Sequence, residues 1–165
     1  MTSILKRNES IISLYDFTGE ALRPWADAGY ACYAFDIQHP KDGRDEAGIC
    51  YRHADLHDLD TIKNLFMEFS NDRVKFGMAF PVCTDMAVSG AAHFKAKAKR
   101  DPDFQTKAVN YAKWCADFFE HLGVPYFVEN PVSVLSSKWR KPDYIFHPNE
   151  YGGYIADDQE QHPRW

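Results

Sequence analysis

The sequence predicts a single α/β domain, residues 1–165, in which helices cover both faces of a mostly parallel, doubly wound sheet in three layers. Two observations carry this prediction. Short apolar runs typical of buried strands alternate with longer segments of helical periodicity along residues 11–131. The chain also has 165 residues, 45% of them hydrophobic, which suits one domain with a well-buried core. Such alternation builds βαβ units with right-handed crossovers, so the strands are expected to run parallel.

Each strand is predicted from a short apolar run that a charged or turn-forming residue closes. The predicted strands are residues 11–15, 30–35, 49–53 and 74–80, followed by one in the segment 125–131. Between the first two strands we expect a helix, because Pro24 suits the first turn of a helix and Gly29 suits its end.

Two longer segments have the periodicity of amphipathic helices. In the first, with Asp58 or Asp60 as its cap, the apolar residues recur at i, i+3, i+4 and i+7: Ile62, Leu65, Phe66 and Phe69. The second begins at Asp101-Pro102 and ends at Gly123. Its apolar face consists of Ala108, Ala112, Cys115, Phe119 and Leu122, so Cys115 is predicted to be a core residue.

Composition excludes several classes of protein. No window has the length of apolar sequence that a membrane span requires, and the first ten residues lack the apolar core of a secretory signal, which predicts a cytoplasmic location. A net charge of −5 argues against a surface that is basic throughout. The four cysteines form no CxxC pair and are expected to be free thiols.

Three residues with chemical potential follow predicted strands: Asp36, Cys83 and Glu129. In a parallel sheet, ligands bind at the carboxyl ends of the strands, so these residues are expected at one edge. Each also has a purely structural reading. Asp36 could cap a turn, Cys83 could be an inert apolar filler, and Glu129 could belong to a strand-ending turn.

The first strand-to-helix turn holds one glycine, Gly19, and therefore lacks the three-glycine fingerprint of pyrophosphate-binding folds. A nucleoside cofactor without phosphates suits this turn better. An acidic residue at the end of the second strand, here Asp36, can accept hydrogen bonds from both hydroxyls of a ribose.

Over residues 11–135, four motifs in this order resemble the cytosine-C5 DNA methyltransferases, and among them a compact phage-type branch. They are Phe17-Thr18-Gly19, Asp36, the "FPVC" segment with Cys83, and the "VENP" segment with Glu129 and Asn130. The resemblance implies a Rossmann-like, S-adenosylmethionine-dependent fold and, for a bacteriophage protein, the host cytoplasm. Val82 and Thr84 depart from the Pro-Pro-Cys-Gln pattern of the family.

The resemblance also implies roles for individual residues. Cys83 would add as a thiolate to C6 of cytosine, Glu129 would bind N3 and the exocyclic amine, and Asn130 would shape the loop. Phe17 would lie near the adenine, Gly19 near the methionine part, Asp36 on the ribose and Asp55 near the adenine amine. Thr18 and Pro81 complete the residues implied for the cofactor site.

DNA would be the macromolecular partner, with the target cytosine flipped into the pocket. After Cys83 comes a basic run that is either a solvated face or a phosphate contact: Lys95, Lys97, Lys99 and Arg100. Ser89 and Arg140 are further candidates for DNA contact, although a surface position or stacking on a tryptophan also explains Arg140.

Residues 132–165 form an aromatic, turn-rich extension in place of the family's target-recognition region, which predicts a truncated chain or a minimal enzyme that reads little sequence. A non-catalytic homologue that binds DNA or a host defence or restriction protein is an alternative. Methylation of an exocyclic amine is another. No metal is predicted, because Cys50, His53 and His57 have no fourth ligand nearby for zinc.

Overall fold

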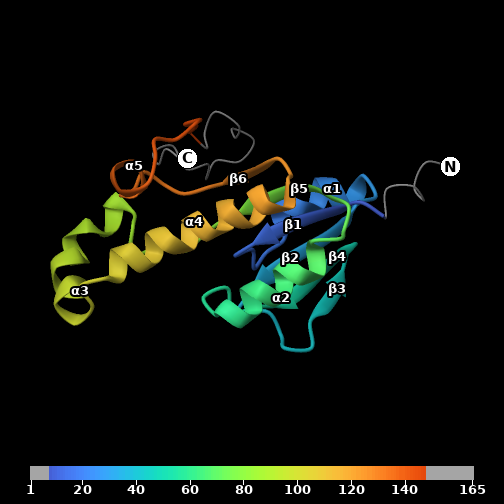
Figure 1. The fold of residues 1–165 in the computed structure, drawn as a ribbon, viewed down its shortest axis with the longest axis horizontal. Helices are drawn as coiled ribbons and strands as arrows, with labels where there is room; N and C mark the ends of the chain where they lie inside the picture. The colour runs from blue at the N-terminus through green and yellow to red at the C-terminus, as the bar shows by residue number, and fades with distance from the viewer. Residues whose placement is uncertain (1–7, 148–165) are drawn as a thin grey trace, which may run out of the picture. The chain divides into compact units, whose positions relative to one another are not determined.

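The computed structural model describes residues 8–147, which form an α/β fold with a six-stranded, mostly parallel sheet. The strands are β1 (Ser10–Leu14), β2 (Ala31–Asp36), β3 (Arg44–Glu46), β4 (Ile49–His53), β5 (Val74–Ala79) and β6 (Tyr126–Val128). Their order in the sheet is β3-β4-β2-β1-β5-β6 (Figure 1). The chain divides into two compact units, one of residues up to Phe80 with Trp114–Phe127, the other of Pro81–Lys113 with residues from Val128 on.

In the first unit, β1 pairs in parallel with β2 and β5, and β2 pairs in parallel with β4. The edge strand β3 pairs with β4 in the antiparallel direction. The chain moves outward from β1 to β2 and β4, then returns to the other side of β1 for β5. The strand order therefore reverses between β1 and β5, and in open α/β sheets ligands bind at the carboxyl ends of strands at such a point. The predicted α/β class is confirmed, and the sheet is compatible with a Rossmann-like fold.

Helices cover both faces of this sheet. On one face, a 3-10 turn (Glu20–Leu22) and α1 (Arg23–Asp27) place Leu22 and Trp25 on the cluster that contains Ile11. On the other face, Phe69 of α2 (Leu59–Phe69) contacts Phe35 edge-on, with ring centroids 5.9 Å apart. Phe119 of α4 (Phe104–Leu122) packs directly on Gly77 of β5. Burial of each such side chain contributes about 1.5–3 kcal/mol to folding.

The second unit contains a 3-10 helix (Val88–His93), α3 (Phe94–Arg100), the first half of α4 and α5 (Leu135–Lys138). Its buried cluster consists of Met86, Ala108, Val109, Ala112 and Leu135. An antiparallel bridge between Ala87 and Ser133 joins the segment after β5 to the segment after β6.

Most predicted elements are confirmed within a few residues. Asp58, rather than Asp60, caps α2, because its carboxylate accepts a hydrogen bond from the Thr61 amide at 2.9 Å. Cys115 is fully buried, as expected for a core residue. The longest helix begins at Phe104, three residues later than predicted. The elements that the sequence did not predict are the two 3-10 segments, β3, α3 and α5.

The expectation of a single domain over residues 1–165 stays a prediction. Residues 148–165 of the predicted extension lie outside the described residues; within 141–147, Tyr144 and Ile145 are exposed and the Tyr144 ring stacks on Phe146. In the described part of the chain, none of the helices combines the length and the apolar composition needed to cross a membrane.

Candidate functional site

The turn after β1 is built around the carboxylate of Asp16, which is 5% exposed. One carboxylate oxygen accepts hydrogen bonds from the Gly19 amide (2.7 Å) and the Thr18 hydroxyl (3.4 Å). The other accepts from the Ser13 hydroxyl at 2.7 Å. We did not expect this role from the sequence. The signal that could have revealed it is an Asp at the end of a buried strand, three residues before a glycine, where a side chain can satisfy turn amides.

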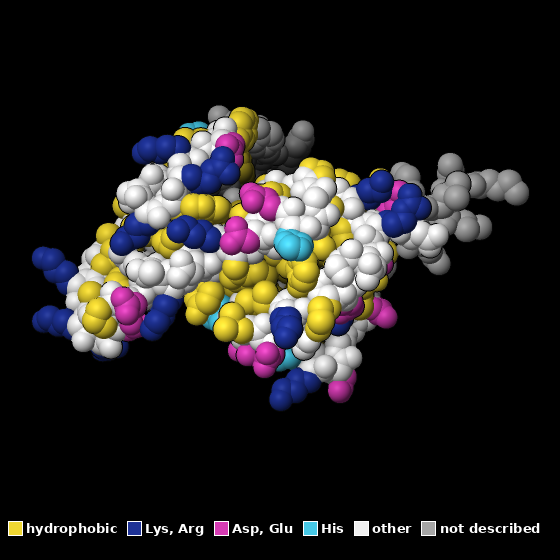
Figure 2. Space-filling model, viewed as in Figure 1, with side chains coloured by type: hydrophobic (Ala, Val, Ile, Leu, Met, Phe, Trp, Pro, Cys, Tyr) yellow, Lys and Arg dark blue, Asp and Glu magenta, His cyan; other side chains and the backbone are white. Residues whose placement is uncertain are grey.

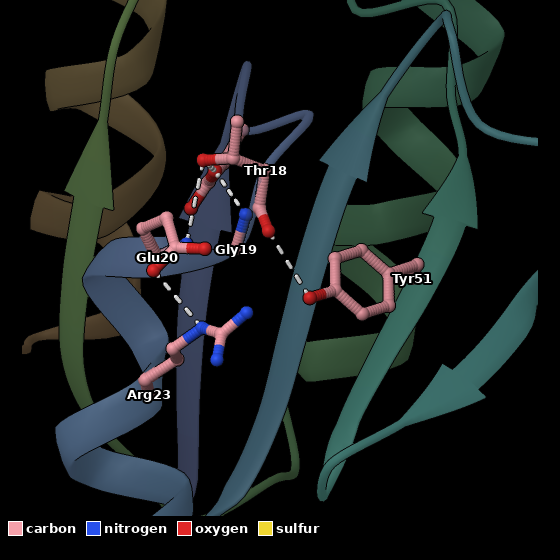
Figure 3. A network of polar contacts seen from close by, with 6 residues as sticks. Thr18, Gly19, Glu20, Arg23 and Tyr51 are labelled. Atoms are coloured by element: carbon pink, nitrogen blue, oxygen red, sulfur yellow. Dashed lines mark hydrogen bonds and ion pairs between the residues drawn. The ribbon is translucent and has the colours of Figure 1, made fainter.

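Gly19 lies against the side chain of Tyr51 from β4 (Figure 3). Its φ of 70° is in the left-handed region, and a Cβ built on it would lie 2.5 Å from the Tyr51 hydroxyl oxygen. That hydroxyl donates a hydrogen bond to the Thr18 carbonyl at 3.1 Å, and the Arg44 guanidinium lies 4.2 Å above the Tyr51 ring. The need for glycine at this position therefore follows from the backbone conformation and from Tyr51.

The end of β2 is joined to this turn by His39. Asp36 is 7% exposed and accepts a hydrogen bond from the Gln38 amide at 2.8 Å. Nε2 of His39 lies 3.0 Å from the Asp16 carbonyl oxygen. Because a carbonyl only accepts, Nε2 carries the proton. Nδ1 is buried and has no hydrogen-bond partner among residues 8–147.

Phe17 stacks on the buried ring of His39, with the ring centroids 5.6 Å apart and an interplanar angle of 22°. The Phe17 side chain is nevertheless 46% exposed. A partly exposed aromatic ring that stacks on a buried one is a surface on which a planar ligand can stack. Phe17 and Asp36 thus lie on two adjacent loops that His39 holds together.

Asp55 follows β4 in the turn before α2. One of its carboxylate oxygens accepts a hydrogen bond from the His57 amide at 3.0 Å, so part of its role is to shape this turn. The Tyr15 hydroxyl donates to the Leu56 carbonyl at 3.2 Å and ties the turn to the loop after β1. Asp55 therefore lies at the same edge of the sheet as Phe17 and Asp36, whereas Pro81 belongs to the second unit.

In the second unit, the loop that carries Cys83 is bonded to the segment that carries Glu129. The Asn130 side-chain amide donates a hydrogen bond to the Pro81 carbonyl at 3.1 Å. Asn130 is 1% exposed, and its Oδ1 is buried with no partner in the described part of the chain. Glu129 precedes it and is half-buried. The structure thus brings together the two segments from which the sequence predicted a catalytic thiol and a carboxylate.

The backbone after Cys83 closes into a tight turn. The Cys83 carbonyl accepts hydrogen bonds from the amides of Met86 (2.9 Å) and Ala87 (2.8 Å). A little further on, the Val88 amide donates to the Val132 carbonyl at 3.1 Å, beside the bridge between the two segments. Cys83 is itself half-buried and lies on this hydrogen-bonded loop.

The other three thiols are poorly suited to act as nucleophiles. Burial raises the pKa of Cys32 to about 11. The pKa of Cys50 is also raised to about 11, first by burial and then by a hydrogen bond with Asp45. Cys115 is fully buried, and burial raises its pKa well above the ordinary value of a thiol. All three stay protonated near neutral pH, and a protonated thiol is a weak nucleophile.

The basic run predicted to contact DNA is the helix α3. Lys95, Lys99 and Arg100 are exposed, and Figure 2 shows Lys and Arg side chains standing out from the region where Figure 1 places this helix. Lys97 differs, because its ammonium group donates to the Thr84 carbonyl (3.1 Å) and to the Asp85 carboxylate (2.5 Å). Lys97 is thus engaged within the protein, whereas Lys95, Lys99 and Arg100 make no ion pair with another residue of the range 8–147.

The two remaining candidates for DNA contact lie elsewhere in the second unit. Ser89 is exposed in the 3-10 helix that precedes α3. Arg140 is exposed and pairs with Asp143 at 2.6 Å, an interaction of the surface type that contributes little to stability. This pairing corresponds to the surface role that the sequence left open for Arg140.

The three residues weighed as zinc ligands have separate surroundings. Cys50 lies opposite Asp45 in the pairing of β3 with β4, and Nδ1 of His53 donates to the His39 carbonyl at 3.0 Å. The His57 ring packs against Tyr15. Within residues 8–147, no three His, Cys, Asp or Glu side chains are grouped so that they could hold a metal ion.

Comparison of the chain with protein-family models, with curated proteins and with solved structures finds no match.

Proposed function

We propose that this chain is an S-adenosylmethionine-dependent DNA cytosine-C5 methyltransferase of the compact phage type. The observation that carries the proposal is the buried hydrogen bond from Asn130 to the Pro81 carbonyl. This bond joins the Cys83 loop to the Glu129 segment within one unit. Covalent catalysis on cytosine needs a thiolate and a carboxyl group on the same base, and these two segments supply them.

Cys83 is the proposed nucleophile. Its thiolate adds to C6 of cytosine, forming an S–C6 bond and moving the electron pair of the C5–C6 double bond toward C5. The carbon C5 becomes enamine-like and able to attack an electrophile. When the C5 proton is later removed, the electron pair reforms the double bond and the thiolate leaves from C6. Cys83 suits this role because the other three thiols are held in their protonated form.

Glu129 is the residue proposed to hydrogen-bond the cytosine ring. A protonated carboxyl group that donates to N3 stabilises the negative charge that thiolate addition pushes into the ring, and its other oxygen can accept from the exocyclic amine. Asn130, fixed to Pro81, keeps this residue in register with the cysteine loop. The exposed cations Lys95, Lys99 and Arg100 would bind phosphates of the DNA backbone.

The residues at the edge of the first unit fit the adenosine part of the cofactor. The Phe17 ring stacks on His39 and the residue is 46% exposed, which suits stacking on adenine. The Asp36 carboxylate, at the end of β2, is suited to accept from ribose hydroxyls, and Asp55 follows β4 at the same edge. Tyr51 occupies the space beside Gly19, so Thr18 and Gly19 would contribute through their backbone. When bound, S-adenosylmethionine supplies an electrophilic methyl group.

The proposal is tested by methyl transfer from radiolabelled S-adenosylmethionine to duplex DNA. We expect incorporation by the wild type, loss of at least a thousandfold in Cys83→Ser, and activity near wild type in Cys50→Ser, which changes the other half-buried thiol. A fall of about this size is typical when a covalent nucleophile is removed. If Cys83→Ser transfers methyl groups as fast as the wild type, the covalent mechanism is wrong.

Two further measurements distinguish the alternatives. Calorimetry with S-adenosylmethionine should show binding; a chain that binds DNA but not the cofactor would instead be a non-catalytic homologue. Mass spectrometry of the modified nucleoside should find 5-methylcytosine. A methyl group on an exocyclic nitrogen would assign the chain to amine methylation.

A further inference from the structure

Lys97 lies on a different face of α3 from the other lysines of the basic run. Lys95 and Lys99 are four residues apart and therefore share a face, while Lys97 is two residues from each and points the opposite way. Burial agrees with this geometry, because Lys95 and Lys99 are exposed and Lys97 is half-buried. Lys95 and Lys99 thus form an outer face that can meet DNA, Arg100 is exposed at the last position of the helix, and Lys97 is the half-buried cation of the run.

The contacts of Lys97 are with the two residues that directly follow Cys83. Its ammonium donates to the carbonyl of Thr84 and pairs with the carboxylate of Asp85. The side chains of Lys97 and Asp85 are 35% and 40% exposed, so water and salt reach the pair. An ion pair at this degree of exposure stabilises the position of a loop only modestly.

The same loop is closed from its other end. Two amides, those of Met86 and Ala87, donate to the Cys83 carbonyl, and the Gly90 amide donates to the Ala87 carbonyl. Lys97 then returns to Thr84 and Asp85 from α3. Within residues 83–97, the side chain of Lys97 therefore connects the turn after Cys83 to α3.

We propose that Lys97 is a positioning residue that fastens the Cys83 loop to α3, and that phosphate contact by this helix is confined to Lys95, Lys99 and Arg100. The consequence for catalysis rests on the proposed role of Cys83 as the nucleophile. The outer face of α3 would contact DNA while Lys97 holds the Cys83 loop to the same helix. DNA bound to α3 would therefore hold the Cys83 loop, and with it the thiol, in a fixed position.

Hydrogen exchange tests the fastening without DNA or cofactor. In Lys97→Met we expect the amides of Met86 and Ala87 to exchange about two- to fivefold faster, the factor that loss of a half-exposed ion pair gives. Asp85→Asn removes the pair from the other side and should have the same effect. Lys99→Met, a matched change on the outer face, should have none.

Two readouts separate fastening from a general loss of structure. Added salt should speed exchange of these amides in the wild type, because it screens the ion pair, but not in Lys97→Met. Alkylation of Cys83 should accelerate in Lys97→Met while that of Cys50 stays unchanged, and Lys97→Arg should restore the wild-type rate. Unchanged exchange and alkylation in both Lys97→Met and Asp85→Asn would overturn the proposal.

Methyl-transfer and DNA-binding assays test whether Lys97 positions the Cys83 loop for catalysis without itself contacting phosphate. Lys97→Met should lower kcat about tenfold to a hundredfold, as misplacement of a reacting group does, and leave the slope of log K against log[salt] unchanged. Lys99→Met should reduce the magnitude of that slope by about 0.9, the value for one lost phosphate contact. A reduced slope in Lys97→Met would make Lys97 a phosphate ligand and overturn the inference. Absence of methyl transfer by the wild type would contradict the proposed function, while the exchange results would still decide the fastening.

Discussion

The side-chain amide of Asn130 donates a hydrogen bond to the backbone carbonyl of Pro81, 3.1 Å away and 49 residues earlier in the chain. Asn130 is 1% exposed, so water does not compete for this bond. It connects the end of the Glu129 segment to the start of the Cys83 loop. The geometry of the proposed catalytic pair depends on this one side chain and on the adjacent bridge between Ala87 and Ser133.

Asn130→Ala should lower the free energy of unfolding by about 1–3 kcal/mol, because the Pro81 carbonyl is left buried without a donor. Urea unfolding measures the change. Asn110→Ala, which alters an exposed asparagine of α4, is the control and should have an effect below about 0.5 kcal/mol. Equal stability of the two variants would show that the Asn130 bond does not stabilise the second unit.

Alanine substitutions at two glycines of the first unit distinguish the cost of backbone strain from the cost of a steric clash. Gly123 has φ of 67° and no described atom within 4 Å of a built Cβ, so Gly123→Ala should cost only the left-handed strain of about 1–2 kcal/mol. Gly19 has the same strain and also meets Tyr51. Gly19→Ala should therefore cost at least about 1 kcal/mol more, because the Tyr51 bond to Thr18 is also lost. Equal losses in urea unfolding would contradict the contact with Tyr51.

Asp36→Asn should weaken binding of S-adenosylmethionine about tenfold to a hundredfold, since a hydrogen bond to a charged acceptor contributes about 1.5–3 kcal/mol. The substitution keeps an oxygen that can accept from the Gln38 amide, so the loop should stay folded. Isothermal calorimetry measures the affinity, with Asp60→Asn on the exposed start of α2 as the control. Unchanged affinity in Asp36→Asn would remove Asp36 from the cofactor site.

Iodoacetamide at pH 8 should modify Cys83 before the other three cysteines. For thiols whose pKa is raised to about 11, as in Cys32 and Cys50, the thiolate fraction at pH 8 is on the order of one in a thousand. The rate at Cys50 should therefore rise with pH, reach half of its maximum near pH 11 and level off only above that pH. Peptide mapping by mass spectrometry gives the individual rates. Modification of Cys50 as fast as Cys83 at pH 8 would contradict this order.

Local pattern was sufficient for most of the fold. The apolar runs of β1, β2 and β5 and the capped, periodic α2 were predictable because burial and capping leave their mark on neighbouring residues. The strand β3 was not, because all three of its residues are exposed and only its pairing with β4 holds it. The helix α3 was missed because its residues have no apolar face that would mark it as a helix.

The candidate site was predictable only as a set of strand-end residues. Asp36, Cys83 and Glu129 could be found because each follows an apolar run. The residues that shape their surroundings could not, because their contacts are long-range: Tyr51 meets Thr18 from 33 residues away, and His39 meets Asp16 from 23 residues away. Lys97 looked like one more cation of a basic run until its contacts with Thr84 and Asp85 were known.

The most direct measurement is covalent trapping of the chain on DNA that contains 5-fluorocytosine. Fluorine at C5 cannot leave as a proton does, so the S–C6 bond formed by Cys83 would persist after methyl transfer. In the presence of S-adenosylmethionine we predict a denaturation-resistant complex that maps by mass spectrometry to the peptide with Cys83 and is absent in Cys83→Ser. If DNA and cofactor both bind but no complex forms, or if the DNA is attached to another residue, Cys83 is not the nucleophile.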